Sequence, residues 1–136
     1  MKPEQITDDL EKLLELLPEG VQKALSSSQN RQDLLEIILD LGRIPEARYP
    51  QKVIALGNTC VSRQELQTTV NRLGKFGPDN RAGIERTLHR ISAIRNRQKD
   101  VVGLTCRVGR AVFGTVEMVR DLIESGQSLL LMGRPG

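Results

Sequence analysis

A regular alternation of apolar and polar side chains constrains the fold of this chain more than any other feature of its sequence. Between residues 101 and 108 every second residue is apolar, at Val102, Leu104, Cys106 and Val108. Successive side chains of a β-strand point to opposite faces of its sheet, so this pattern predicts a strand with one buried face. Residues 91–97 form a second candidate strand, and a turn at residues 98–100 would join the two. We therefore expect a β-hairpin here.

Other segments carry helical signals. Leu10, Leu13, Leu14 and Leu17 follow helical spacing after a cap at Thr7–Asp8, and Pro18 would start a short second helix. The spacing of apolar residues predicts a third helix over residues 32–41. Ser62 and Glu65 form a capping box that opens a helix ending at Gly74. We further expect a short strand over residues 52–56 and a short helix over residues 84–88.

These elements together predict an α+β fold. N-terminal helices (residues 1–42) would pack with a small mixed sheet that contains the hairpin (residues 43–113), and the two segments would share one core. Residues 114–136 read as the start of a following domain: Thr115 caps a helix with Met118, Val119, Leu122 and Ile123 facing inward.

The last residues carry the strongest chemical signal. Leu129 to Met132 are all apolar, which is typical of a strand covered on both faces. Gly133, Arg134, Pro135 and Gly136 follow, and they match the first half of the phosphate-binding pattern GxxxxGK[ST]. In that pattern backbone N–H groups surround phosphate oxygens, a lysine reaches the outer phosphates and a hydroxyl binds Mg²⁺. We therefore expect the N-terminal piece of a larger P-loop ATPase, inactive by itself.

Charge is distributed unevenly along the chain, although the net charge is only +3. Residues 1–40 hold four Lys/Arg against nine Asp/Glu, whereas residues 81–110 hold eight against two. The second segment offers candidate contacts to nucleotide phosphates or nucleic acid at Arg81, Arg86, Arg90, Arg95, Arg97, Arg107 and Arg110. Pairing with the acidic N-terminal helices remains the alternative. With no Trp, one Tyr and two Phe, base stacking on a single strand is disfavoured.

Little in the sequence indicates catalysis by the chain alone. His89 has no companion His, Cys or acid pair nearby, so we expect a structural role for it. Cys60 and Cys106 lack metal-type spacing and are expected as buried free thiols. We predict no catalytic residue, no metal site and no membrane span.

Several strings of the sequence resemble one known family: ITDDLEKLLELLP, LLEIILDLGRIPEARYP, DNRAGIERTLHRISAIRNRQ, GLTCRVGRAVFGT and VRDLIESGQSLLLMGRPG. The chain resembles the N-terminal part of a cyanobacterial and plastid-encoded P-loop (AAA/RecA-like) ATPase family. That family is related to the sporulation stage III AA ATPase and, more distantly, to secretion and pilus-retraction motors. The likeness covers nearly the whole chain, most specifically residues 79–136.

The resemblance implies an α+β N-terminal domain, a RecA-like ATPase core and a C-terminal domain that binds single-stranded nucleic acid. It implies ATP and Mg²⁺ as cofactors of the whole protein, with none in this chain, and a ring, expected as a hexamer, of its own subunits. The location would be the cyanobacterial cytoplasm or the plastid stroma. The chain would then serve assembly or regulation of the ring, and nucleic-acid binding by the arginine block is the alternative function.

Overall fold

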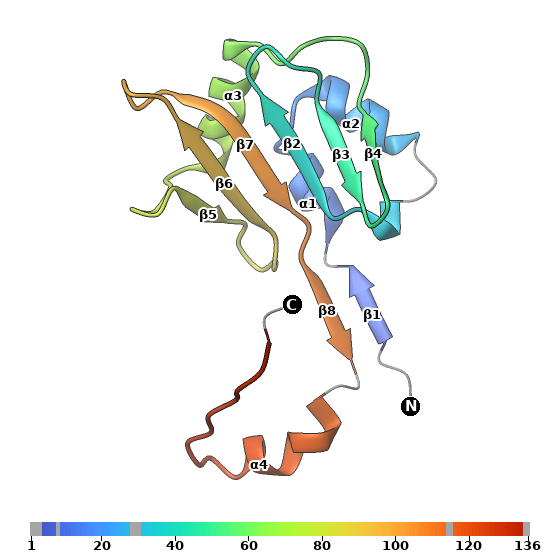
Figure 1. The fold of residues 1–136 in the computed structure, drawn as a ribbon, viewed down its shortest axis with the longest axis vertical. Coiled ribbons are helices and arrows are strands. Elements are labelled where there is room, and N and C mark those ends of the chain that lie inside the picture. The colour runs from blue at the N-terminus through green and yellow to red at the C-terminus, as the bar shows by residue number, and fades with distance from the viewer. Residues whose placement is uncertain (1–3, 8, 28–30, 114–115, 135–136) are drawn as a thin grey trace. The chain divides into compact units, whose positions relative to one another are not determined.

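The computed structural model describes the backbone of residues 4–7, 9–27, 31–113 and 116–134. The chain divides into two compact units, one formed by Thr7–Arg110 and the other by Met1–Ile6 together with Ala111–Gly136. Helices and a six-stranded sheet are both present, which confirms the predicted α+β class. Figure 1 shows the elements of each unit.

The six-stranded sheet of the larger unit has the order β4-β3-β2-β7-β6-β5. Its strands are β2 (Glu36–Asp40), β3 (Glu46–Tyr49), β4 (Lys52–Ala55), β5 (Arg81–Gly83), β6 (Arg90–Arg95) and β7 (Val101–Arg107). The predicted hairpin is confirmed as β6 and β7, and β7 lies near the centre of the sheet. Every pairing within this sheet is antiparallel, so the expectation of a mixed sheet is corrected.

Three helices cover one face of this sheet: α1 (Leu10–Leu14), α2 (Glu19–Ser26) and α3 (Arg63–Leu73). Side chains of the helices and of the inward positions of the strands form one apolar core between them. Its fully covered members include Leu13, Leu17, Leu25, Ile37, Leu39, Leu66, Ile91 and Leu104. The described core residues thus lie between residues 13 and 108, within the segment 1–113 expected to hold it.

Helix α3 forms as its local sequence predicts. The Ser62 hydroxyl accepts a hydrogen bond from the backbone N–H of Glu65, and the Glu65 carboxylate accepts one from the N–H of Ser62, at 3.1 and 3.0 Å. Gly74 ends the helix with φ of +83°, a conformation that glycine adopts without strain. Helices α1 and α2 form within the predicted segments, but α1 ends at Leu14 and its cap position is Asp9, without a side-chain cap. Thr7 belongs to strand β1 (Glu4–Thr7), and Asp8 lies outside the described residues.

The predicted helix over residues 32–41 is wrong. Residues 31–33 form one short 3₁₀ turn, η1 (Arg31–Asp33), and β2 follows. The strand runs antiparallel to both β3 and β7, and Ile37 and Leu39 are fully buried on one side of it. Hydrogen bonds to two neighbouring strands satisfy the backbone N–H and C=O groups of β2. The spacing of apolar residues along the segment does not reveal such distant partners. Strand β3, between Pro45 and Pro50, was not predicted at all.

The short helix predicted over residues 84–88 is also absent. This segment connects β5 to β6 through a turn, in which Arg86 has φ of +62°. A right-handed helix requires negative φ, so this backbone cannot continue one. The Thr87 backbone N–H instead bonds to the Ile84 carbonyl at 3.0 Å.

The smaller unit contains little regular structure. Strands β1 (Glu4–Thr7) and β8 (Arg110–Phe113), whose residues Thr7 and Arg110 belong to the larger unit, form a two-stranded sheet. The segment η2 (Val116–Val119) leads into α4 (Arg120–Glu124). The helix predicted after Thr115 is thus short, and Thr115 itself and the Met118 side chain lie outside the description. The strand expected at residues 129–132 is not formed: residues 127–134 contain neither helix nor strand. No described strand pairs with this segment.

Candidate anion-binding surface

The expected phosphate-loop residues belong to the smaller unit, and the structure describes two of the four. Gly133 and Arg134 are exposed, while Pro135 and Gly136 lie outside the described residues. The preceding apolar side chains are uncovered as well, with exposed fractions of 82% for Leu130, 72% for Leu131 and 88% for Met132. The role of these four positions in phosphate binding therefore stays a prediction.

The structure separates the arginine block into groups with different surroundings, and two of its members are bound within the fold. Arg95 donates hydrogen bonds to Asn80 Oδ1 and to the Lys99 carbonyl, both at 2.9 Å, and lies 5.9 Å from the centre of the Phe76 ring. Arg110 donates to the carbonyl oxygens of Gln32 and Leu34. The guanidinium group of Arg95 thus holds the hairpin turn, and that of Arg110 holds the segment that leads from η1 to β2.

A third member, Arg107, takes part in an ion-pair network on the sheet. Glu36 is 7% exposed, and its carboxylate lies 2.7 Å from Arg48 Nη2 and 3.5 Å from Arg107 Nη2. The two arginines compensate a carboxylate that would be costly to bury alone. Charge pairing between the basic block and the acidic N-terminal region therefore occurs, on strand β2 in place of the expected helix. Both guanidinium groups keep solvent contact, so each pair contributes modestly to stability.

Arg81 and Arg90 lie on the same face of the sheet as Arg107. The strand register aligns Gly83, Arg90, Arg107, Glu36 and Arg48 in one row across five strands. Arg81, Ser92 and Thr105 occupy the adjacent row. These positions alternate with the buried ones, so they point away from α1, α2 and α3, which lie behind the sheet in Figure 1. We call this surface, formed by Arg81, Arg90, Ser92, Thr105 and Arg107, the arginine face.

A hollow borders the arginine face at its β5 edge. It is open to solvent and has a volume of about 450 Å³. Its lining consists of Asp79, Arg81, Gly83 and Arg90 together with Ala82, Thr87, Leu88 and His89. Asp79 is engaged in the preceding turn, where its Oδ1 accepts a hydrogen bond from the Arg81 backbone N–H at 3.2 Å. Within the described part of the chain, no hydrogen bond or ion pair engages the guanidinium groups of Arg81 and Arg90. These two cations are available to an anion.

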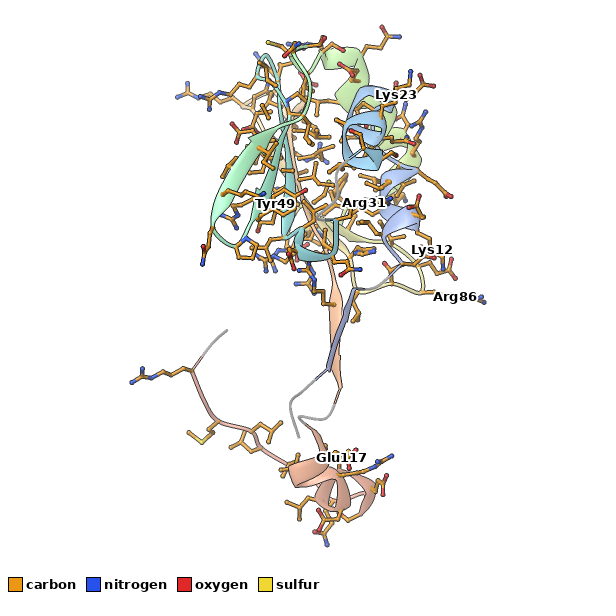
Figure 2. The ribbon with its side chains drawn as sticks, turned by 90° about the vertical axis from the view of Figure 1, so that its right-hand side faces the viewer. Lys12, Lys23, Arg31, Tyr49, Arg86 and Glu117 are labelled. Atoms are coloured by element: carbon orange, nitrogen blue, oxygen red, sulfur yellow. The ribbon has the colours of Figure 1, made fainter. Side chains whose placement is uncertain are left out.

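The remaining predicted arginines do not join this surface. Arg86 is exposed in the turn between β5 and β6, and Arg97 is exposed in the hairpin turn. Figure 2 shows Arg86 extending away from the body of the unit. The structure thus brings three of the seven candidate arginines together and disperses the others. Ser92 and Thr105 are site residues that the sequence analysis missed, and the alternation along β6 and β7 was the available signal.

His89 has the structural role that was expected of it. It is 2% exposed, its Nδ1 accepts a hydrogen bond from the Gly109 backbone N–H at 2.8 Å, and its Nε2 lies 2.7 Å from the Asp9 carbonyl. Since Nδ1 accepts a hydrogen bond, the ring proton is on Nε2, and this N–H group donates a hydrogen bond to the backbone carbonyl oxygen of Asp9. His89 thereby connects the segment before α1 to the segment after β7. The backbone at residue 109 can approach residue 88 this closely only as glycine, because a Cβ at position 109 would lie 2.3 Å from the Leu88 carbonyl carbon.

The two cysteines are free, as expected, but only Cys106 is buried and Cys60 is exposed. Among the residues that the structure describes, no group of three or more His, Cys, Asp or Glu side chains is arranged to hold a metal ion. In the same residues no helix combines the length and the apolar character needed to cross a membrane.

Comparison with known sequences identifies close relatives. The uncharacterized protein ycf45 of Porphyra purpurea is 56% identical over 131 residues, which cover 96% of this chain and 23% of the relative. The protein SEEDLING PLASTID DEVELOPMENT 1 of Arabidopsis thaliana is 48% identical over 130 residues, 96% of this chain and 19% of the relative. These proteins are its homologues. The uncharacterized protein ycf45 of Cyanidium caldarium is 45% identical, and the chain covers 39% of it.

The chain therefore spans between about a fifth and two fifths of the length of these relatives. No protein-family model matches the sequence. Among solved structures, the X-ray structure of the Legionella pneumophila ATPase DotB is similar with a TM-score of 0.40 and 15% identity, over 65% of this chain and 27% of that chain.

Proposed function

We propose that this chain is the N-terminal module of a larger, ring-forming P-loop ATPase and that it acts in assembly or regulation of the ring. The single observation that carries the proposal is the sequence at residues 129–136, where four apolar residues precede Gly133-Arg134-Pro135-Gly136. A buried strand that runs into a glycine-containing turn is the context in which a phosphate-binding loop begins.

The surroundings of this segment support the same proposal. Leu129, Leu130, Leu131 and Met132 are 45–88% exposed. Covering such side chains is worth roughly 1.5–3 kcal/mol each at full burial. A central strand of a RecA-like core would be covered on both faces by the rest of that domain. The greater length of the homologues leaves room for such a domain.

ATP and Mg²⁺ would be cofactors of the longer protein. The backbone N–H groups of Gly133 to Gly136 would contact phosphate oxygens, and the two glycines allow close approach of the backbone to them. The lysine and the Mg²⁺-binding hydroxyl of the pattern would have to follow Gly136. Since these groups supply much of the stabilisation of phosphoryl transfer, the 136-residue chain should be inactive. We propose a location in the plastid stroma or the cyanobacterial cytoplasm, and the name of the Arabidopsis thaliana relative, which refers to plastid development, supports a link to plastids.

The test asks whether the reading frame continues beyond Gly136 and compares the 136-residue chain with the longer protein that we expect it to encode. We expect Gly-Lys-Ser/Thr directly or shortly after Gly136, ATP hydrolysis by the longer protein and its sedimentation as a ring. For the shorter chain we expect no ATP binding by calorimetry and no phosphate release above a boiled control. A longer protein without this motif, or micromolar ATP binding by the short chain, would contradict the proposal.

A further inference from the structure

We infer that the arginine face binds the phosphate backbone of double-stranded nucleic acid without reading its sequence. This inference is independent of the proposed ATPase function, since it rests on the sheet of the larger unit alone. The surface consists of Arg81, Arg90 and Arg107 with the hydroxyls of Ser92 and Thr105, all on the side of the sheet opposite to the helices.

The arrangement of charges points to an anionic partner. Arg90 and Arg107 lie directly opposite each other on β6 and β7. Like charges in this position destabilise a sheet. Glu36 compensates Arg107 from the β2 side, at 3.5 Å. On its other side Arg90 faces Gly83, which has no side chain and leaves the space above β5 open. Neither Arg81 nor Arg90 forms an ion pair among the described residues, and the one carboxylate in the adjoining hollow, that of Asp79, leaves a net positive charge that an anion at this place would neutralise.

The shape and chemistry of the surface suit a phosphate partner. Guanidinium groups present paired donors that match phosphate oxygens, and the two hydroxyls add further donors between them. Ser92 is the cross-strand neighbour of both Arg81 and Thr105, so donors from three strands lie side by side. The hollow of about 450 Å³ beside Arg81 and Arg90 provides room for the backbone of a nucleic acid.

The lack of aromatic side chains indicates which nucleic acid is bound. Tyr49 is 4% exposed and belongs to the core, and Phe76 packs near Arg95. No described aromatic residue lies on the arginine face. Proteins that hold single strands without sequence preference stack the bases on aromatic rings. A duplex offers its phosphates without requiring such stacking, so duplex binding by charge alone is the better match.

Acidic residues restrict this surface to one half of the sheet. Glu46 on β3 and Asp40 on β2 occupy the same face beyond Glu36. The predicted contact is therefore confined to β5, β6 and β7. This limit allows a local test, because Arg81 and Arg90 can be changed without touching the Glu36 network.

The test measures the affinity of the 136-residue chain for short DNA and RNA duplexes at several salt concentrations. The variant Arg81→Gln/Arg90→Gln should melt no lower than the unsubstituted chain, since both side chains are exposed and the repulsion between Arg90 and Arg107 is removed. It should bind duplex at least about tenfold more weakly, with a salt slope lower by roughly 0.9 for each lost phosphate contact. Two duplexes of different sequence should bind equally. The matched control Lys23→Gln/Arg63→Gln removes the same charge from α2 and α3 and should bind as the parent does.

Three outcomes would overturn the inference. Equal losses in the variant and the control would show a diffuse charge effect. Equal displacement of the chain from duplex by polyglutamate would identify a docking surface for an acidic protein. Tighter binding to single strands than to duplexes, or displacement by low concentrations of inorganic phosphate, would indicate a different ligand.

Discussion

At the residue scale, the core depends most on the side chains at the centre of the sheet. Leu104 on β7 is completely buried, and it lies opposite Leu39 on β2 and Ala93 on β6. Thr105, the next residue, is half-buried on the other face of the same strand. Substitutions at Leu104 and Thr105 therefore compare the helix-covered face of the sheet with its open face.

Replacing Leu104 by Asp should unfold the protein. An unpaired carboxylate would enter the core, and the loss of the leucine side chain alone typically costs about 2–5 kcal/mol. The total stability of a domain is only about 5–15 kcal/mol. Thermal melting followed by circular dichroism should show no cooperative transition. The matched variant Thr105→Asp, whose side chain lies among arginines, should melt cooperatively. An unchanged melting temperature of Leu104→Asp would contradict the strand facing.

The two thiols should differ in reactivity. Burial raises the pKa of the Cys106 thiol from 9.0 to about 12. The folded state therefore retains this proton where the unfolded state has lost it, so the contribution of Cys106 to stability falls as the pH rises from 9.0 towards about 12. Near neutral pH a thiol reagent should modify exposed Cys60 quickly and Cys106 only after denaturation. In the variant Cys60→Ser, Cys106 is the remaining thiol, and its fast labelling before denaturation would refute this prediction.

At the element scale, the chain contains helices that form from local signals and strands that require partners. Helix α3 begins at a capping box and ends at a glycine, and both signals lie within its own sequence. Strand β2 carries apolar residues at helical spacing but pairs with β3 and β7. Short apolar segments satisfy either periodicity, and in this case the neighbouring strands decide between them.

The substitution Ser62→Ala should destabilise the protein by about 1 kcal/mol, because it removes the side-chain acceptor of the Glu65 N–H. Chemical denaturation should reveal a lower midpoint with an unchanged slope. Ser26→Ala serves as the control, since the Ser26 hydroxyl only bonds back to the Gln22 carbonyl at the exposed end of α2. Equal midpoints for the two variants would mean that the cap contributes little to stability.

At the scale of the whole molecule, the apolar core formed by the described residues belongs to the larger unit. The described core lies between Leu13 and Val108, whereas Leu129 to Met132 remain exposed in the smaller unit. Exposed apolar side chains in an extended segment favour association with another chain.

Deletion of residues 127–136 should therefore weaken self-association at high protein concentration. Sedimentation velocity of the full chain and of the truncated chain would measure the effect. Leu130→Gln/Leu131→Gln should act like the deletion, while Val53→Gln, at a 56% exposed position on β4, should not. Monomeric behaviour of both the full and the truncated chain would rule out association through this segment.

Sequence reasoning succeeded where the signal is local or strictly periodic. The α+β class, the hairpin of β6 and β7, the ends of α3 and the structural role of His89 all follow from such signals. It also identified the arginine block, but it did not predict which of the seven arginines lie together. Side-chain alternation and capping act over a few residues, so their energetic consequences are readable from the chain itself.

The tertiary structure alone decided the rest. Residues 36–40 became a strand because two partners satisfy their backbone, and residues 84–88 form a turn because they must connect two adjacent strands. Register across the sheet, which depends on contacts between distant residues, placed Arg81, Arg90 and Arg107 together and bound Arg95 and Arg110 into the fold. Sequence spacing determines which face of a strand a residue occupies, but only strand pairing determines which residues become its neighbours.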